Sequence, residues 1–171
     1  MSDKLIAFYS RADENYVRGM LKNLTVGNTE IVADIIAEFT GADLFKIEQS
    51  DEYSKNYNEC IEQARRDQRL NARPKLKEYL ENIDNYKVIY LGFPNYWGTM
   101  PMAVFTFLES LDFGGKIIKP FCTHEGSGFG NSIADIKRLC LSAKIENGFT
   151  IIGGNAEGAK QDIEKWLRKG K

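Results

Sequence analysis

The sequence contains little cysteine, a single histidine and no excess of charge of either sign. Its three cysteines, Cys60, Cys122 and Cys140, show no paired spacing, so we expect neither a disulfide framework nor a thiolate metal site. The 23 basic residues are interspersed among 24 acidic ones, which gives a net charge of −1. Nucleic-acid surfaces are strongly basic. We therefore expect reduced, buried thiols, no metal and no nucleic-acid partner.

The sequence also lacks a long hydrophobic run. Only a short apolar segment follows Asp3 and Lys4, and neither a signal-peptide pattern nor a membrane-spanning length is present. This predicts a cytoplasmic protein with no membrane partner. A length of 171 residues, without linker, repeat or low-complexity tract, is typical of one domain over residues 1–171.

Apolar runs typical of strands alternate with helical patterns along the chain. Strands are expected over residues 4–9, 42–48, 87–93, 116–123 and 145–153. Helices are expected over about 29–40, 55–70, 74–80, from 101 onward, 131–141 and 157–168. This alternation predicts an α/β fold with a parallel sheet covered by helices on both faces.

Two segments leave alternatives open. The helix that begins at Pro101 is apolar around most of its surface, which fits deep packing or contact with a second subunit. The chain could therefore be a monomer or a homodimer. Pro120 lies inside the expected fourth strand, although proline is tolerated only at a strand edge, start or bulge. That strand could therefore begin later than residue 116.

The turn after the first strand carries the most informative pattern of the chain. Ser10 and Arg11 end the strand, and after a polar insert the sequence Val26-Gly27-Asn28-Thr29 leads into the first helix. Free N–H groups at a helix start bind anions, and the hydroxyls of Ser10 and Thr29 would add donors. Because no Lys-Ser or Lys-Thr follows the glycine, we do not expect a nucleoside triphosphate. The pattern predicts a phosphate cradle, although plain helix capping has the same signature.

Two later loops follow the third and fourth expected strands, at the same end of the sheet as the first turn. One is aromatic and suited to hold a flat ring: Pro94, Asn95, Tyr96, Trp97, Gly98 and Thr99. The other is rich in glycine: Thr123, His124, Glu125, Gly126, Ser127 and Gly128. Ligands of open α/β sheets bind outside the carboxyl ends of the strands, so we expect one site built from three loops. Since Glu125 occupies a position where a nucleophile elbow needs glycine, a serine hydrolase is not expected.

With these motifs the chain resembles the flavodoxins, whose first loop has the form Ser-Arg-Thr-Gly-Asn-Thr. The resemblance implies a flavodoxin-like three-layer α/β/α sandwich, a five-stranded parallel sheet of order 2-1-3-4-5, and FMN as cofactor. It assigns the phosphate to Ser10, Arg11, Gly27, Asn28 and Thr29. The loop 94–99 would supply an aromatic wall, with Trp97 foremost and Tyr96 second, and the loop 123–128 would bind the pyrimidine edge. The expected fifth strand is uninterrupted, as in the short-chain form.

The chain departs from the family pattern at two places. Residues 12–25 split the phosphate motif, and Val26 replaces a threonine whose hydroxyl would bind phosphate. Restoring threonine at position 26 is therefore expected to strengthen FMN binding. Tyr16 of the insert is expected near the site. The insert either folds over the cofactor or forms an excursion on the surface.

The function implied by the resemblance is electron transfer between redox partner proteins through the quinone, semiquinone and hydroquinone states of bound FMN. No catalytic side chain is required. Gly98 would let a peptide rotate and accept a hydrogen bond from flavin N5–H. Carrier flavodoxins are strongly acidic, whereas this chain is nearly neutral. Two alternatives therefore stay open: an FMN-dependent NAD(P)H:quinone oxidoreductase, and a binding module that has lost FMN.

Overall fold

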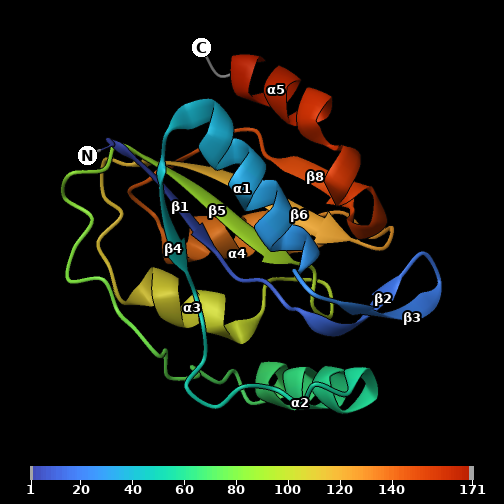
Figure 1. The fold of residues 1–171 in the computed structure, drawn as a ribbon. Helices are drawn as coiled ribbons and strands as arrows, with labels where there is room; N and C mark the ends of the chain where they lie inside the picture. Colours follow the sequence, from blue (N-terminus) through green and yellow to red (C-terminus); the bar gives the residue numbers. More distant parts are fainter. Residues whose placement is uncertain (1, 170–171) are drawn as a thin grey trace.

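The structure, a computed structural model that describes residues 2–169, contains a central parallel sheet between two layers of helices (Figure 1). In spatial order its strands are β4 (Asp43–Lys46), β1 (Lys4–Phe8), β5 (Val88–Pro94), β6 (Ile117–His124) and, in the fifth place, β7 (Lys144–Ile145) followed by β8 (Phe149–Ile152). All of these strand pairs are parallel. The predicted α/β class and the strand order 2-1-3-4-5 are confirmed.

The helices are divided between the two faces of the sheet (Figure 1). One face carries α1 (Asn28–Thr40), the short 3-10 helix η1 (Gly153–Gly158) and α5 (Lys160–Lys169). The other carries α3 (Met102–Glu109) and α4 (Ser132–Leu139), with α2 (Tyr57–Arg69) beyond α3. In the part of the chain that the structure describes, no helix combines the length and the apolar character needed to cross a membrane.

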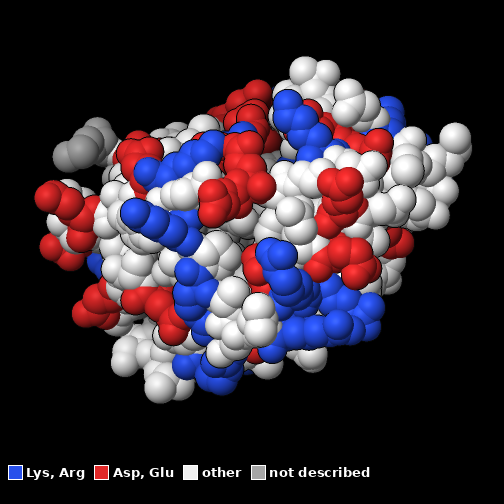
Figure 2. All heavy atoms as spheres, turned by 90° about the horizontal axis from the view of Figure 1, so that it is seen from below, with Lys and Arg blue, Asp and Glu red and all other residues white. Residues whose placement is uncertain are grey.

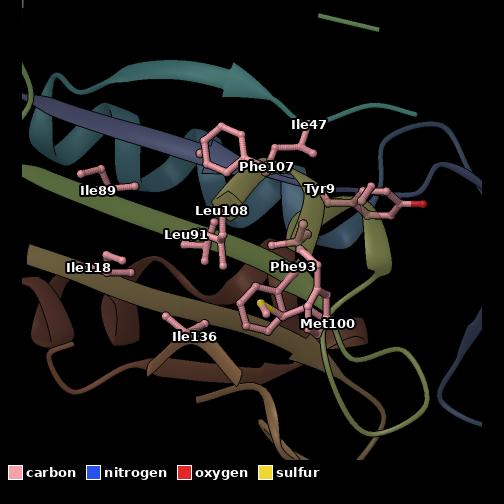
Figure 3. Close-up of a cluster of buried hydrophobic side chains, with 14 of the residues drawn as sticks. Tyr9, Ile47, Ile89, Leu91, Phe93, Met100, Phe107, Leu108, Ile118 and Ile136 are labelled. Atoms are coloured by element: carbon pink, nitrogen blue, oxygen red, sulfur yellow. The ribbon is translucent and has the colours of Figure 1, made fainter. Parts of the chain in front are cut away.

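Side chains of the strands alternate between the two faces and build two apolar cores. Leu91 and Phe93 of β5 point toward α3 and α4, whereas the intervening Gly92 faces the other core. A Cβ at Gly92 would lie 2.1 Å from the ring of Phe121, so glycine provides the space for that ring. Figure 3 shows the first core, where side chains from α3, including Phe107, pack against the sheet. Six of the eight residues of α3 are buried within the chain, which confirms deep packing as the reason for its apolar surface.

The helix expected over residues 74–80 does not form. This segment is extended, and Leu76 forms a bridge with Gln49. The Ser50 N–H donates to the Lys75 carbonyl at 2.8 Å, and the Lys77 N–H donates to the Glu48 carbonyl at 2.9 Å. Because Leu76 is buried at 2% exposure, tertiary packing and this pairing outweigh the local helical pattern.

The expected fifth strand, residues 145–153, is not continuous, and the cause is Pro120. β6 begins at Ile117 and continues through Pro120, which pairs with Leu91 on the β5 side. On its other side, β6 pairs with β7 at Ile117 and Ile118 and with β8 only from Phe121 onward. Proline has no N–H to donate, so the neighbouring strand leaves the ladder after Glu146, whose N–H still donates to the Ile118 carbonyl at 3.0 Å.

The insert after β1 forms an antiparallel hairpin of β2 (Asp13–Val17) and β3 (Met20–Leu24). Arg18 and Gly19 connect the strands with φ angles of 52° and 81°. Positive φ at both positions is typical of the two-residue turns that suit the twist of a hairpin. In Figure 1 the hairpin projects from the carboxyl end of the sheet, near the start of α1 and above one end of α2.

Candidate functional site

A cavity of about 380 Å³ lies at the carboxyl ends of β1, β5 and β6. This volume is within the range of small-molecule pockets, roughly 300–1,000 Å³. The predicted residues that line it are Arg11, Tyr16, Asn28, Pro94, Asn95, Tyr96, Trp97, Gly98, Thr123, His124, Glu125 and Ser127. The predicted residues that do not line it are Ser10, Gly27, Thr29, Thr99, Gly126 and Gly128. The three loops therefore do meet at one place, and some of their residues support the site from behind.

The start of α1 forms one end of the cavity. Ser10 Oγ accepts the Glu30 N–H at 3.0 Å, and the hydroxyls of Thr29 and Thr123 lie 2.8 Å apart in a buried hydrogen bond. Both expected phosphate-binding hydroxyls are thus engaged within the protein. The N–H groups of Asn28 and Thr29 are in the first helical turn, where no intrahelical acceptor exists. No other acceptor lies within hydrogen-bonding distance of them among residues 2–169.

Gly27 lets the chain pass close to the start of α1. A Cβ at this position would lie 2.3 Å from Ser10 Oγ and 2.5 Å from the Arg11 carbonyl oxygen. Real Cβ atoms do not approach other atoms so closely. The glycine of the motif is therefore required by the crossing of two backbone segments, and the next residue, Asn28, lines the cavity.

The turn Tyr96–Thr99 forms the opposite end. Trp97 and Gly98 have φ angles of 53° and 87°, and the Tyr96 N–H donates to the Thr99 carbonyl at 2.8 Å. Glycine adopts such a φ without strain, whereas tryptophan does not. Trp97 is held in place because its Nε1–H donates to the Ile61 carbonyl at 2.8 Å.

The peptide between Trp97 and Gly98 is held at both of its polar groups. Gln68 Nε2 donates to the Trp97 carbonyl at 3.2 Å, and the Gly98 N–H donates to Asn95 Oδ1 at 2.9 Å. Asn95 Nδ2 also donates to the Gly128 carbonyl at 2.8 Å. One side chain therefore links the aromatic turn to the glycine-rich loop.

The loop after β6 contributes the only histidine of the chain. His124 Nδ1 accepts the Gly126 N–H at 2.9 Å, which requires an unprotonated Nδ1. Burial lowers the pKa of His124 below its usual value, an effect that the nearby Glu125 carboxylate opposes. The imidazole is thus an internal support of the loop, while Glu125 Oε2 accepts the Arg18 N–H from the hairpin at 3.1 Å.

The hairpin is a wall of the cavity, so it is not an excursion away from the site. Its turn is held by Arg18, whose guanidinium donates to the Gly154 carbonyl at 2.9 Å and to Asn155 Oδ1 at 2.7 Å. On the other side, Glu14 accepts the Tyr57 N–H at 2.8 Å, at the start of α2. The rings of Tyr16 and Tyr57 are stacked with centroids 5.9 Å apart.

Sequence reasoning missed a second wall, which α2 provides. The lining residues that it did not identify are Asn15, Tyr57, Cys60, Ile61, Ala64 and Gly153. Four of these belong to α2, at the spacing of one helical face. That stripe is visible in the sequence, but the segment 59–73 is densely charged, which is typical of a solvated surface helix. Only the fold shows that the stripe faces a cavity.

The Tyr96 hydroxyl is buried within the protein. Among the described residues it is the one buried side-chain nitrogen or oxygen atom without a hydrogen-bond partner. Burial also raises the pKa of the Cys60 thiol in the α2 wall, so this thiol is protonated. Within residues 2–169 there is no group of metal-ligating side chains.

Comparisons with known proteins agree with this arrangement. A family model described as Flavodoxin matches residues 22–170. A flavoprotein from Bacteroides uniformis is 25% identical, with a TM-score of 0.75 over 94% of this chain and 97% of that chain. A flavoprotein from Bacteroides eggerthii is also 25% identical, with a TM-score of 0.73 over 96% of this chain and 95% of that chain. A flavoprotein solved in complex with FMN, from Lactobacillus acidophilus, shares the fold at 16% identity and a TM-score of 0.68, over 96% of this chain and 97% of that chain. No curated protein matches the sequence.

Proposed function

The chain belongs to the flavodoxin family, and from this premise we propose that it binds FMN in the cavity and carries single electrons between redox proteins. The main support for the proposal is that two different kinds of groups lie at the two ends of one cavity. Unpaired N–H groups at the start of α1 suit a phosphate, and the aromatic turn at Tyr96 and Trp97 suits a flat ring. The FMN complex of the Lactobacillus acidophilus flavoprotein, which has the same fold, supports this choice of ligand.

The residues fit FMN in the following way. The N–H groups of Asn28 and Thr29 would hold the phosphate, while Gly27 keeps the backbone close enough for that contact. The ring would lie beside Tyr96 and Trp97 on one side and the loop 123–127 on the other. FMN, when bound, supplies the redox chemistry. The chain contributes binding, exclusion of water and, through Asn95, a defined position for the Gly98 N–H.

The walls of the cavity favour electron transfer over hydride transfer. Hydride transfer requires a nicotinamide to stack on the face of the flavin, whereas an electron can leave through an exposed edge. The hairpin and α2 close two sides of the cavity through Tyr16, Tyr57 and Ile61. Trp97, which is 44% exposed, lies at the boundary between cavity and solvent. The buried surface of α3 leaves no need for a second subunit, so we propose a monomeric carrier.

The test is a titration of flavin-free protein with FMN and with riboflavin, followed by flavin fluorescence. We expect FMN to bind at least about a hundredfold more tightly, because riboflavin lacks the phosphate that the start of α1 would hold. Equal binding of both ligands would reject the phosphate site. Failure to bind either would support a module that has lost FMN, and rapid NAD(P)H oxidation by the loaded protein would support a reductase.

A matched pair of variants tests the ring end. Trp97→Ala is expected to weaken FMN binding about tenfold, because it removes the aromatic wall. Trp166→Phe changes the second tryptophan of the chain, which packs in the opposite core against Phe149 and Tyr90. It should leave FMN affinity unchanged. Equal effects of the two variants would contradict the placement of the ring.

A further inference from the structure

An arginine lies at the solvent-exposed edge of the cavity. The guanidinium of Arg65 lies 4.9 Å above the ring of Trp97, whose exposed fraction is 44%. Leu70, at the end of α2, is 70% exposed. An exposed tryptophan beside an arginine has the composition of an interface centre. At this place only the side chain of Trp97 lies between the cavity and solvent.

The positive charge is concentrated in the second half of α2. Arg65, Arg66 and Arg69, which we name the arginine face, occupy five consecutive positions that also contain Asp67. Arg65 and Arg69 are one helical turn apart and so share a side of the helix. Figure 2 views the molecule from below, the side on which α2 lies in Figure 1, and shows a broad blue area at the lower right of this view.

The acidic residues near the arginine face are mostly engaged elsewhere. Asp67 accepts the Tyr53 hydroxyl at 2.6 Å, and its contact with Arg66 is a longer one of 3.6 Å. Glu109 is paired with Arg73. Asp135 lies 3.2 Å from Arg138 and also accepts the Thr99 hydroxyl.

Arg65 and Arg69 themselves have no carboxylate partner within 4.0 Å among residues 2–169. Glu62, one turn earlier on α2, adds negative charge to the same side of the helix, and Asp51 lines a small cavity together with Arg66. Along α2 itself, residues 62–69 carry three arginines against Glu62 and Asp67, an excess of one positive charge, although the chain as a whole has a net charge of −1.

We propose that the arginine face and Trp97 form the docking surface for an acidic one-electron redox protein. The proposal rests on the proposed function and adds the charge of the partner. In the encounter, one electron leaves the reduced flavin and reduces the oxidised metal centre of the partner, and no bond is formed or broken at the surface. Complementary charge accelerates such encounters and sets their orientation.

A protein partner fits this surface better than the phosphates of a nucleotide. The arginine face lies along the outside of a helix, so its guanidinium groups do not converge on one anion. A neighbouring cavity of about 420 Å³ lies on the other side of the Trp97 turn. The arginine that lines it, Arg138, is paired with Asp135. Spread positive charge around exposed apolar side chains matches an extended acidic surface.

The experiment measures binding by isothermal titration calorimetry, with two probe proteins of opposite charge. The probes are a plant-type [2Fe–2S] ferredoxin, which is strongly acidic, and a c-type cytochrome, which is strongly basic. Binding is measured at low and at high salt, with and without FMN. We expect the ferredoxin to bind, its affinity to fall at least about tenfold in high salt, and the cytochrome not to bind.

The double variant Arg66→Gln/Arg69→Gln removes two charges and leaves Arg65 on Trp97. We expect it to lower ferredoxin affinity roughly three- to tenfold at low salt. Lys165→Gln on α5, an exposed lysine on the other face of the sheet, is the matched control and should have no effect. Circular dichroism of both variants verifies that the fold is retained.

Three outcomes would overturn the proposal: tighter binding of the cytochrome, ferredoxin binding that the double variant does not change, or binding of NADPH but not ferredoxin at these arginines. Docking and cofactor binding can fail separately. Ferredoxin binding by a protein that takes up no FMN would support the docking surface and reject the proposed electron carrier. FMN binding without ferredoxin binding would support the proposed electron carrier and reject the docking surface.

Discussion

The two ends of the cavity are built by different means. At the start of α1 the N–H groups of Asn28 and Thr29 have no partner among residues 2–169, and the side chains of Ser10 and Thr29 stabilise the turn. At the opposite end, Asn95 and Gln68 hold the Trp97–Gly98 peptide by direct hydrogen bonds. The first end therefore depends on the path of the backbone, and the second depends on particular side chains.

This difference explains which departures from the family pattern the chain tolerates. A fourteen-residue insert, residues 12–25, separates Arg11 from Val26 without disturbing the crossing at Gly27, because the hairpin closes on itself and leaves its two ends adjacent. No comparable insertion interrupts the sequence from Pro94 to Thr99, where a change of length would separate Asn95 from Gly98. The comparison makes four predictions, beginning with the largest expected effect.

Gly27→Ala should have the largest effect, because its Cβ would overlap with Ser10 Oγ and the Arg11 carbonyl. We expect the free energy of unfolding to fall by about 2 kcal/mol and FMN affinity to fall about tenfold or more. Thermal unfolding and FMN titration measure these changes. Gly158→Ala is the control, since its Cβ would meet nothing within 4 Å. Similar losses in both variants would show that the crossing at Gly27 is not special.

Asn95→Ala should have a smaller but clear effect at the ring end. It removes the acceptor of the Gly98 N–H and the donor to the Gly128 carbonyl, which should lower the free energy of unfolding by about 1–2 kcal/mol. FMN affinity should fall several-fold, as measured by fluorescence. Asn58→Ala, at an exposed position of α2, serves as the control. A stable Asn95 variant with normal affinity would contradict the dependence of this end on side chains.

The protonation of His124 should have a modest effect. Because burial lowers its pKa below the ordinary 6.5, the unfolded chain binds more protons between the two pKa values. Stability is therefore complete above pH 6.5 and falls as the pH drops toward the lowered pKa, by less than about 1 kcal/mol for this partly exposed group. NMR titration of this only histidine measures the pKa directly. An elevated pKa would contradict the acceptor role of Nδ1, and His124→Asn should remove the pH dependence.

Val26→Thr should have the smallest effect. The sequence predicts a gain in FMN affinity from a restored threonine, but Val26 is 39% exposed and does not line the cavity. We now expect a change of less than about twofold in the FMN titration, because the phosphate end relies on backbone groups. A large gain would show that a hydroxyl at position 26 reaches the phosphate.

Sequence patterns predicted the strands of the sheet. They failed where contacts with neighbouring elements determine the local secondary structure. The alternation of apolar runs predicted an α/β fold with a parallel sheet, and the resemblance to the flavodoxins implied the strand order 2-1-3-4-5. The local pattern wrongly predicted a helix over residues 74–80, because it does not show that Leu76 forms a bridge with Gln49. The local pattern also predicted one continuous fifth strand, because Pro120 affects a neighbouring strand that lies more than twenty residues later in the sequence. Interactions distant in sequence leave no local pattern.

The sequence by itself determined the α/β class and the loops that meet at the carboxyl end of the sheet. Local periodicity and turn chemistry suffice for these features. Only the tertiary structure decided that the hairpin and α2 enclose the cavity, and that Ser10 and Thr29 support it from behind. It also decided that Arg65 of α2 lies over the ring of Trp97. The physical reason is that enclosure and local charge depend on which side chains pair across distant segments, and folding alone determines those pairs.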